Sequence, residues 1–123
     1  MKLVSAGEKP LVVTIAVEET GGNGLIATVL GGTKPHVGGT AVAVPRQKSS
    51  GDGLTADISQ ICVPGHKDVY MAAEVSKILA VETGQTASVT AGVHVDGAQV
   101  EEIAQLMENA RMAARGWVGA YNA

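Results

Sequence analysis

The hydrophobic pattern of this chain switches between two periods, and this limits the folds that are open to it. Over residues 11–18 and again over residues 86–95, apolar side chains alternate with polar or small ones. A period of two is typical of strands that bury one face. Over residues 68–83 and 100–115, apolar side chains recur at the spacing of amphipathic helices. The chain therefore combines half-buried strands with helices that have one apolar face.

Glycine-rich turns divide the rest of the chain into short β-rich segments. The Gly-Gly-Asn-Gly turn at residues 21–24 separates residues 11–18 from residues 25–30, which predicts a hairpin. Further strands are expected at residues 37–44 and 54–63. Three segments show neither period and are expected outside the strands and helices: an exposed loop at residues 45–53 and terminal segments at residues 1–10 and 116–123.

The resulting element order, β-β-β-β-α-β-α, predicts a two-layer architecture. Four consecutive strands with short links favour antiparallel pairing, and a helix then carries the chain to the fifth strand. We therefore expect an α+β fold, a single domain over residues 1–123, with a mostly antiparallel five-stranded sheet and both helices on one face. Asp68 and Asp96 are expected to cap the starts of the helices, and Gly84 to end the first helix.

Small side chains dominate the apolar part of the sequence. Phenylalanine is absent, the aromatic residues are Tyr70, Trp117 and Tyr121, and 16 residues are glycine. A core of alanine and valine is thin and brings backbones close together. The sheet face away from the helices carries Thr, Ser, Gly, Ala and Val, so we expect it to be solvated or to meet a second subunit.

Charge and hydropathy exclude several classes of protein. The formal net charge is -3 and the basic residues are scattered, which argues against a nucleic-acid-binding surface. No apolar run approaches the length of a membrane span. The N-terminal residues lack the apolar stretch of a signal peptide, and a single cysteine, Cys62, excludes an internal disulfide. We therefore expect a cytoplasmic protein without a membrane or nucleic-acid partner.

Alternating strand direction places all three histidines at one edge of the sheet. The second and fourth predicted strands end beside His36 and His66, and the fifth strand ends at His94. This holds for any strand order, because it depends only on each element crossing the sheet once. The same edge carries residues suited to an anion, namely two lysines and two pairs of glycines with accessible amides: Lys34, Lys67, Gly31, Gly32, Gly38 and Gly39.

These residues leave several interpretations open. His36, His66 and His94 could bind a divalent metal or an acidic ligand, or could be unrelated, solvated loop residues. Cys62 lies near His66 and could be a nucleophile, although a strand-end cysteine is more often a small buried filler. Arg46 is expected to be a solvated loop charge, with contact to a ligand phosphate as the alternative. No Ser-His-Asp arrangement stands out.

Three short segments resemble a known family. Gly-Gly-Thr-Lys-Pro-His-Val-Gly-Gly at residues 31–39, Val-Pro-Gly-His-Lys-Asp at residues 63–68 and Gly-Val-His-Val-Asp at residues 92–96 are similar to the LpdD-type prenylated-flavin chaperones, the small D subunits of gallate decarboxylase. The resemblance covers roughly residues 11–115. It implies an α+β fold related to the proteasome assembly chaperones, and a homodimer.

The resemblance also implies a function without a catalytic residue. It implies an accessory protein that binds prenylated FMN, or FMN, and delivers it to, or protects it for, a UbiD-type decarboxylase of gallate-like aromatic acids. The flavin prenyltransferase is a further implied partner. Five positions match the family segments and become candidate cofactor contacts, in addition to Gly38 and Gly39: Lys34, His36, His66, Lys67 and His94.

Two other functions compete with this interpretation. One is a small metal-dependent enzyme in which His36, His66 and His94 hold the ion and a water molecule is the nucleophile. The other is an assembly or interaction protein that has no ligand and pairs through its sheet face.

Overall fold

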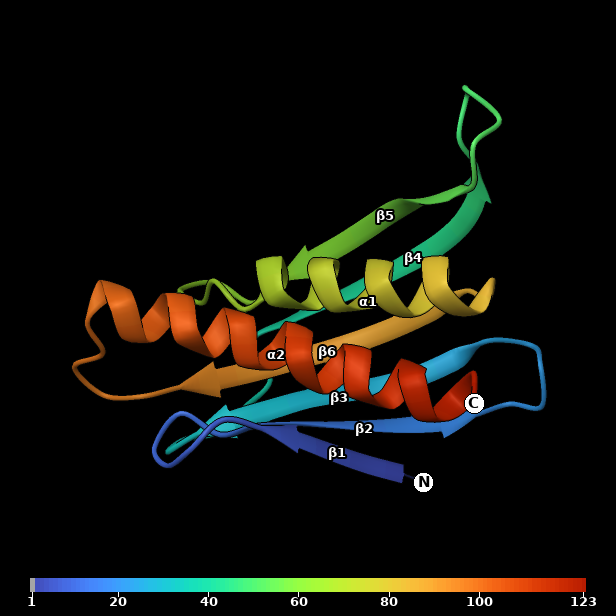
Figure 1. Ribbon diagram of the computed structural model, residues 1–123. Coiled ribbons are helices and arrows are strands. Elements are labelled where there is room, and N and C mark those ends of the chain that lie inside the picture. Colours follow the sequence, from blue (N-terminus) through green and yellow to red (C-terminus); the bar gives the residue numbers. More distant parts are fainter. Residues whose placement is uncertain (1) are drawn as a thin grey trace.

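The computed structural model describes residues 2–123 as one six-stranded sheet with two helices packed on one of its faces (Figure 1). The two-layer α+β class and the placement of both helices on one face are as the sequence predicts. The elements in chain order are β1 (Lys2–Ala6), β2 (Val13–Glu19), β3 (Leu25–Gly32), β4 (Gly39–Gln47), β5 (Leu54–Cys62), α1 (Val69–Thr83), β6 (Ala87–His94) and α2 (Val100–Tyr121).

The prediction of a five-stranded sheet is wrong by one strand. Residues 2–6, which the sequence analysis assigns to a terminal segment, form β1 and pair antiparallel with β2. The hydroxyl groups of Ser5 and Thr14 hydrogen-bond across this pair at 2.7 Å. A five-residue edge strand is too short for a recognisable hydrophobic period, and its structure comes from the partner strand.

The sheet is mixed, with the order β1-β2-β3-β6-β4-β5. Helix α1 returns the chain from the edge strand β5 to the centre, where β6 inserts between β3 and β4. Strands β3 and β6 run parallel, while the other paired strands of residues 2–123 are antiparallel. As a result β3, β5 and β6 end, and β4 begins, at the same edge of the sheet (left in Figure 1). We call this the histidine edge.

The core lies between the sheet and the helices and is built mainly from small side chains. In β2 the buried residues are Val13, Ile15 and Val17, and the intervening residues are partly exposed, as a period of two requires. Helix α1 covers β4, β5 and β6, whereas α2 covers β1 and β2. Both helices approach the sheet closely because alanines occupy much of their buried faces: Ala72, Ala80, Ala110, Ala113 and Ala114.

The predicted end of the first helix is confirmed, and Asp68 occupies the N-cap position of α1 as predicted, although its side chain makes no capping hydrogen bond. The predicted N-cap at Asp96 is wrong. Gly84 has a left-handed backbone with φ of 71° and donates to the Ala80 carbonyl at 2.8 Å. The Asp68 carboxylate bonds to β6 instead of the first turn of α1. Helix α2 begins after Gln99, which forms a capping box with Glu102, so Asp96 lies outside this helix.

The C-terminal boundary of α2 also differs from the prediction. The helix continues to Tyr121, so Trp117 and Tyr121 belong to it rather than to a terminal segment, and their rings stack with centroids 4.9 Å apart. Their four-residue spacing places both side chains on one helix face. No helix within residues 2–123 is long and apolar enough to cross a membrane.

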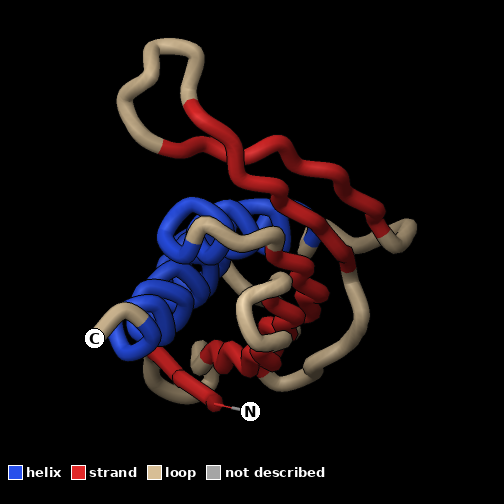
Figure 2. The backbone as a smooth tube through the Cα atoms, turned by 90° about the vertical axis from the view of Figure 1, so that its right-hand side faces the viewer, coloured by secondary structure: helices blue, strands red, loops and turns tan. Residues whose placement is uncertain are grey.

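Strands β4 and β5 form a hairpin that projects from the rest of the molecule (Figure 2). Residues 45–47, predicted as loop, extend β4, so the exposed loop is shorter and covers residues 48–53. The register of the sheet places a set of exposed aliphatic side chains on the face opposite the helices: Leu3, Ile26, Leu30, Val42, Val44 and Ile61.

Candidate functional site

The histidine edge brings together His36, His66 and His94, the three histidines of the chain. The ring of His36 lies 4.6 Å from the ring of His66 and 6.4 Å from that of His94, measured between centroids. The residues come from the loop before β4, the loop after β5 and the last position of β6. The predicted strand directions place all three histidines at this edge, and the adjacency of β3, β6, β4 and β5 in the sheet brings them together.

The loop that carries His36 lies directly against β6. The His36 amide donates to the Gly92 carbonyl at 3.4 Å and the Gly38 amide donates to the Ala91 carbonyl at 2.9 Å. A Cβ atom on Gly92 would overlap the His36 carbonyl group. This glycine is thus required by the close approach of two backbones, and it positions His36 beside the end of β6.

Asp68 is the functional candidate that the sequence analysis missed, because an aspartate directly before a helical pattern indicates an N-cap. Its carboxylate is only 9% exposed and accepts a hydrogen bond from the Val93 amide at 2.9 Å. The other carboxylate oxygen, Oδ2, lies 2.9 Å from Nε2 of His36 and 3.9 Å from Nδ1 of His66. Asp68 therefore connects α1, β6 and two of the three histidines.

The surroundings of His36 favour its protonated form. Nδ1 lies 2.9 Å from the Lys34 carbonyl oxygen, and this contact raises the pKa of His36 most. The hydrogen bond and charge of Asp68 raise the pKa further, while partial burial lowers it. A carbonyl and a carboxylate only accept, so both ring nitrogens donate. Binding of this proton stabilises the folded state fully at pH values below the ordinary histidine pKa of 6.5. The stabilisation is lost as the pH rises through the raised pKa of His36.

His94 takes part in a separate, exposed network. Its Nε2 lies 2.8 Å from Oδ1 of Asp96, and Oδ2 of Asp96 lies 3.0 Å from the Lys34 ammonium group. The hydrogen bond with His94, and then the contact with Lys34, lower the pKa of Asp96. Asp96 thus links the loop after β3 to the loop after β6.

A cleft of about 640 Å³ opens beside these groups, which is the size range of pockets for small ligands and cofactors. Its polar side consists of His36, His66, Lys67, Asp68 and His94. The apolar part of the lining, which we call the apolar wall, comes from α1, the end of β6 and the first turns of α2: Met71, Val93, Val95, Val100, Ile103, Leu106 and Met107.

The apolar wall arises because α2 begins beyond the end of the sheet (Figure 1). The helical spacing of apolar residues over 100–115 predicts that Val100 and Ile103 belong to the buried stripe of this helix, but they are 79% and 57% exposed. Their helical spacing is regular, and only the overhang of α2 determines that they face the cleft region instead of the sheet.

Four of the seven predicted cofactor contacts line the cleft, namely His36, His66, Lys67 and His94. Lys34 pairs with Asp96 beside it. Gly38 and Gly39 are buried under the start of α1, where a Cβ on Gly38 would meet the Asp68 carboxylate and one on Gly39 would lie 2.6 Å from the Cα of Val69. Close packing of the protein on itself therefore accounts for both glycines, and their contact with a cofactor stays a prediction.

Two further candidates lie apart from the cleft. Cys62 is exposed rather than a buried filler, and its thiol donates to the His66 carbonyl at 3.0 Å. Arg46 lies on β4 and pairs with Asp57 on β5 at 2.9 Å. Arg46 thus stabilises the projecting hairpin.

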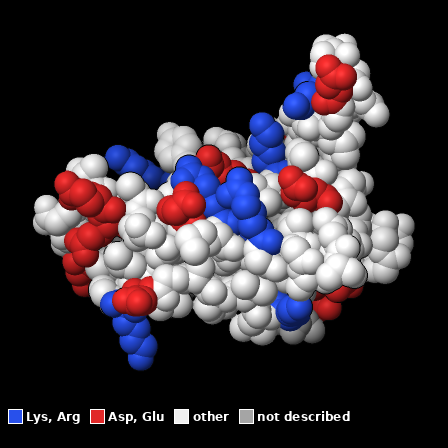
Figure 3. Space-filling model, in the orientation of Figure 1, with Lys and Arg blue, Asp and Glu red and all other residues white. Residues whose placement is uncertain are grey.

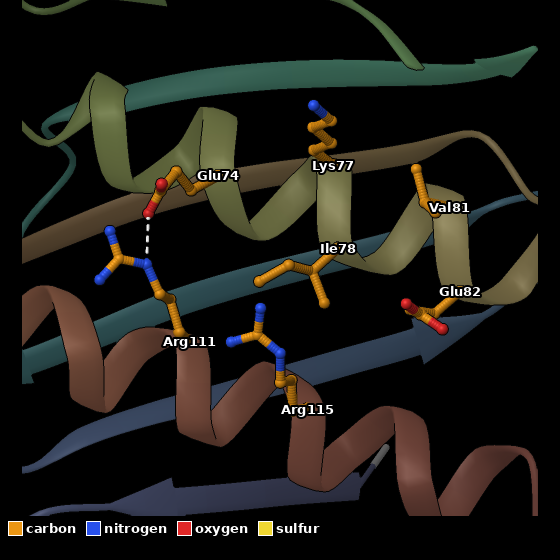
Figure 4. A pocket seen from close by; sticks show the side chains of 7 residues that line it. All are labelled: Glu74, Lys77, Ile78, Val81, Glu82, Arg111 and Arg115. Atoms are coloured by element: carbon orange, nitrogen blue, oxygen red, sulfur yellow. Dashed lines mark hydrogen bonds and ion pairs between the residues drawn. The ribbon is translucent and has the colours of Figure 1, made fainter. Parts of the chain in front are cut away.

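A smaller hollow of about 250 Å³ lies between α1 and α2 (Figure 4). Charged side chains gather over the two helices in this region (Figure 3). Arg111 donates to Glu74 on α1 at 2.8 Å and to Glu108 at 3.2 Å, and these acidic partners raise its pKa. Because Arg111 is already paired with two carboxylates, one of which joins α2 to α1, we place the candidate site at the larger cleft.

Comparison with models of protein families assigns the chain to a family. The model of the prenylated flavin chaperone LpdD-like domain matches residues 7–121. The chain belongs to the LpdD-like prenylated flavin chaperone family. The resemblance of the three short segments is thereby confirmed, and the family match extends from before β2 to the end of α2.

Solved structures support the fold of this LpdD-like chain independently. A chain from the crystal structure of a novel chaperone complex for yeast 20S proteasome assembly superimposes with a TM-score of 0.58. The similarity covers 98% of this chain and 94% of the other, at 13% sequence identity, and thus concerns the fold alone. No curated protein sequence matches the chain significantly.

Proposed function

We propose that this LpdD-like protein is a non-catalytic accessory protein that binds prenylated FMN in the cleft. It delivers the cofactor to, or protects it for, a UbiD-type decarboxylase of gallate-like aromatic acids. The observation that carries this proposal is the 640 Å³ cleft, with one polar and one apolar wall, in a chain of the prenylated flavin chaperone family. The flavin prenyltransferase, as the source of the cofactor, is the second proposed partner, and the proposed location is the cytoplasm.

The chemistry of the two walls fits a flavin nucleotide. Lys67 offers positive charge, and the imidazole rings offer hydrogen-bonding groups, to a phosphate. The apolar wall offers aliphatic and thioether groups to a ring system, and methionine sulfur atoms such as that of Met107 make favourable contacts with aromatic rings. Prenylated FMN would supply the chemistry of decarboxylation, whereas this chain would bind and shield it.

We expect Met107→Glu to reduce retention of prenylated FMN at least about 10-fold, because a carboxylate in the apolar wall loses hydration when the ring binds. His66→Ala is expected to weaken retention about 5- to 100-fold by removing one polar partner. The measurement is flavin absorbance after desalting of protein mixed with reduced prenylated FMN, or with FMN.

Lys77→Ala is the matched control, since Lys77 lines the hollow between the helices. This variant is expected to retain flavin like the unmodified protein. Failure of the unmodified protein to retain either flavin contradicts the proposal, as does equal retention by Met107→Glu and Lys77→Ala.

We further propose that the protein is a homodimer that pairs through the outer sheet face. Six exposed aliphatic side chains lie on this face, and a face that exposes several large apolar side chains is typical of an interface. Val42→Glu, on the outer face of β4, is expected to convert a dimer to a monomer in size-exclusion chromatography with light scattering. Val100→Glu, on α2, is expected to leave the dimer intact. A monomeric unmodified protein would contradict this arrangement.

A further inference from the structure

We infer that His36, His66 and Asp68 form a binding site for a divalent transition-metal cation at the polar end of the cleft. One ligand atom from each residue lies within 4.8 Å of the others. The set differs from the three histidines that the sequence suggests, because His94 is engaged by Asp96 at 2.8 Å and Asp68 takes its place.

The spacing of these three groups is close to that of a bound ion. Ligand nitrogen and oxygen atoms lie about 2.0–2.2 Å from zinc, so two of them lie at most about 4.4 Å apart. The Nε2 of His36 and the Nδ1 of His66 lie 2.9 and 3.9 Å from Oδ2 of Asp68. The spacing of the set, up to 4.8 Å, slightly exceeds this limit, so binding of one cation requires the exposed His66 ring to turn towards Asp68 and His36.

The contacts around the set orient its free ligand atoms. His36 uses Nδ1 for the Lys34 carbonyl, which directs Nε2 towards the ion site. Asp68 uses Oδ1 for the Val93 amide, which leaves Oδ2 for the ion. Metal-binding histidines and carboxylates are held in this way by a second hydrogen bond in most metalloproteins. A cation would replace the proton between Nε2 and Oδ2, and that proton would pass to solvent.

Two imidazoles and one carboxylate suit Zn²⁺, Co²⁺, Mn²⁺ or Fe²⁺ and leave coordination positions open. All three residues line the cleft, so an open position faces the space proposed for the ligand. An oxygen atom of a phosphate bound there could occupy this position. This coupling to a phosphate rests on the proposed function, whereas binding of the metal itself does not.

The test is titration of the untagged, EDTA-treated protein with Co²⁺, followed by visible absorbance, and with Zn²⁺, followed by calorimetry. We expect one ion per chain. His66→Ala is the primary variant because its ring is exposed, and we expect it to weaken binding at least about 10-fold. Asp68→Asn is expected to have a similar effect, with folding checked by circular dichroism. His94→Ala is the matched control and is expected to bind as tightly as the unmodified protein.

Absence of binding, or equal affinity in the His66→Ala and His94→Ala variants, overturns the metal site. Flavin retention is then measured with and without Zn²⁺. Metal binding without retention of flavin contradicts the proposed function and upholds the metal site. Retention of flavin by a protein that binds neither cation upholds the proposed function and overturns the metal site.

Discussion

Replacing Trp117 by alanine is expected to lower the free energy of unfolding by about 3–5 kcal/mol. Trp117 is 1% exposed and is the largest fully buried side chain of the core. Its neighbours in that core are mostly alanine and valine, which are too short to fill the space it would leave. Urea denaturation followed by circular dichroism at 222 nm measures the change, because the variant lacks the tryptophan fluorophore.

Two variants separate loss of packing from general damage to α2. Met112 lies five residues before Trp117 on the same helix and is 52% exposed, so Met112→Ala is expected to change the stability by less than about 0.5 kcal/mol. Trp117→Phe keeps an aromatic ring, so its free energy of unfolding is expected to fall less than that of Trp117→Ala. A loss below about 1.5 kcal/mol for Trp117→Ala would contradict the central role of this ring.

Gly92→Ala is expected to destabilise the protein by about 3 kcal/mol or more and to abolish flavin retention. The new Cβ atom would overlap the His36 carbonyl group, and backbone cannot rotate out of the way as a flexible side chain can. The loop that carries His36 must therefore move away from β6. This movement breaks the contact of His36 with Asp68 and changes the polar wall of the cleft. Denaturation and flavin retention after desalting measure the two effects.

Gly119→Ala provides the opposite control. Gly119 lies in α2, and no heavy atom within the described chain, residues 2–123, lies within 4 Å of where its Cβ would be, apart from its own helix backbone and chain neighbours. Alanine is favoured over glycine in a helix, so the free energy of unfolding of this variant is expected to rise by about 0.5–1 kcal/mol. The variant is also expected to retain flavin. Equal stability of Gly92→Ala and Gly119→Ala would show that the His36 loop does not depend on close approach to β6.

The histidine edge is the part of the site that sequence reasoning predicts best. His36, His66 and His94 each follow or end a predicted strand, and the direction of each strand follows from the number of crossings. The missed strand β1 does not disturb this result, because it precedes the first of these crossings. The sequence predicts the position of Asp68 at the N-cap of α1 correctly but not the partners of its carboxylate, which bonds to the Val93 amide on β6 and to His36.

The apolar wall of the cleft shows the opposite case. The spacing of Val100, Ile103 and Met107 indicates one helix face, and a sequence pattern does not distinguish a face that packs on a sheet from one that extends past it. The hydrophobic pattern also does not predict that β6 inserts between β3 and β4, since strand order depends on pairing between residues distant in the chain. Both features follow from contacts between residues that are distant in the chain.

The alternation of strands and helices, the small-residue core and the shared edge of the three histidines can be predicted from the chain alone, because they follow from local period and chain direction. The contacts of Asp68 with His36 and His66, the pairing of His94 with Asp96 and the lining of the cleft by the overhang of α2 appear only in the folded molecule. The physical reason is that side-chain contacts within a few ångströms depend on the relative position of packed elements, and that position is set by the whole core.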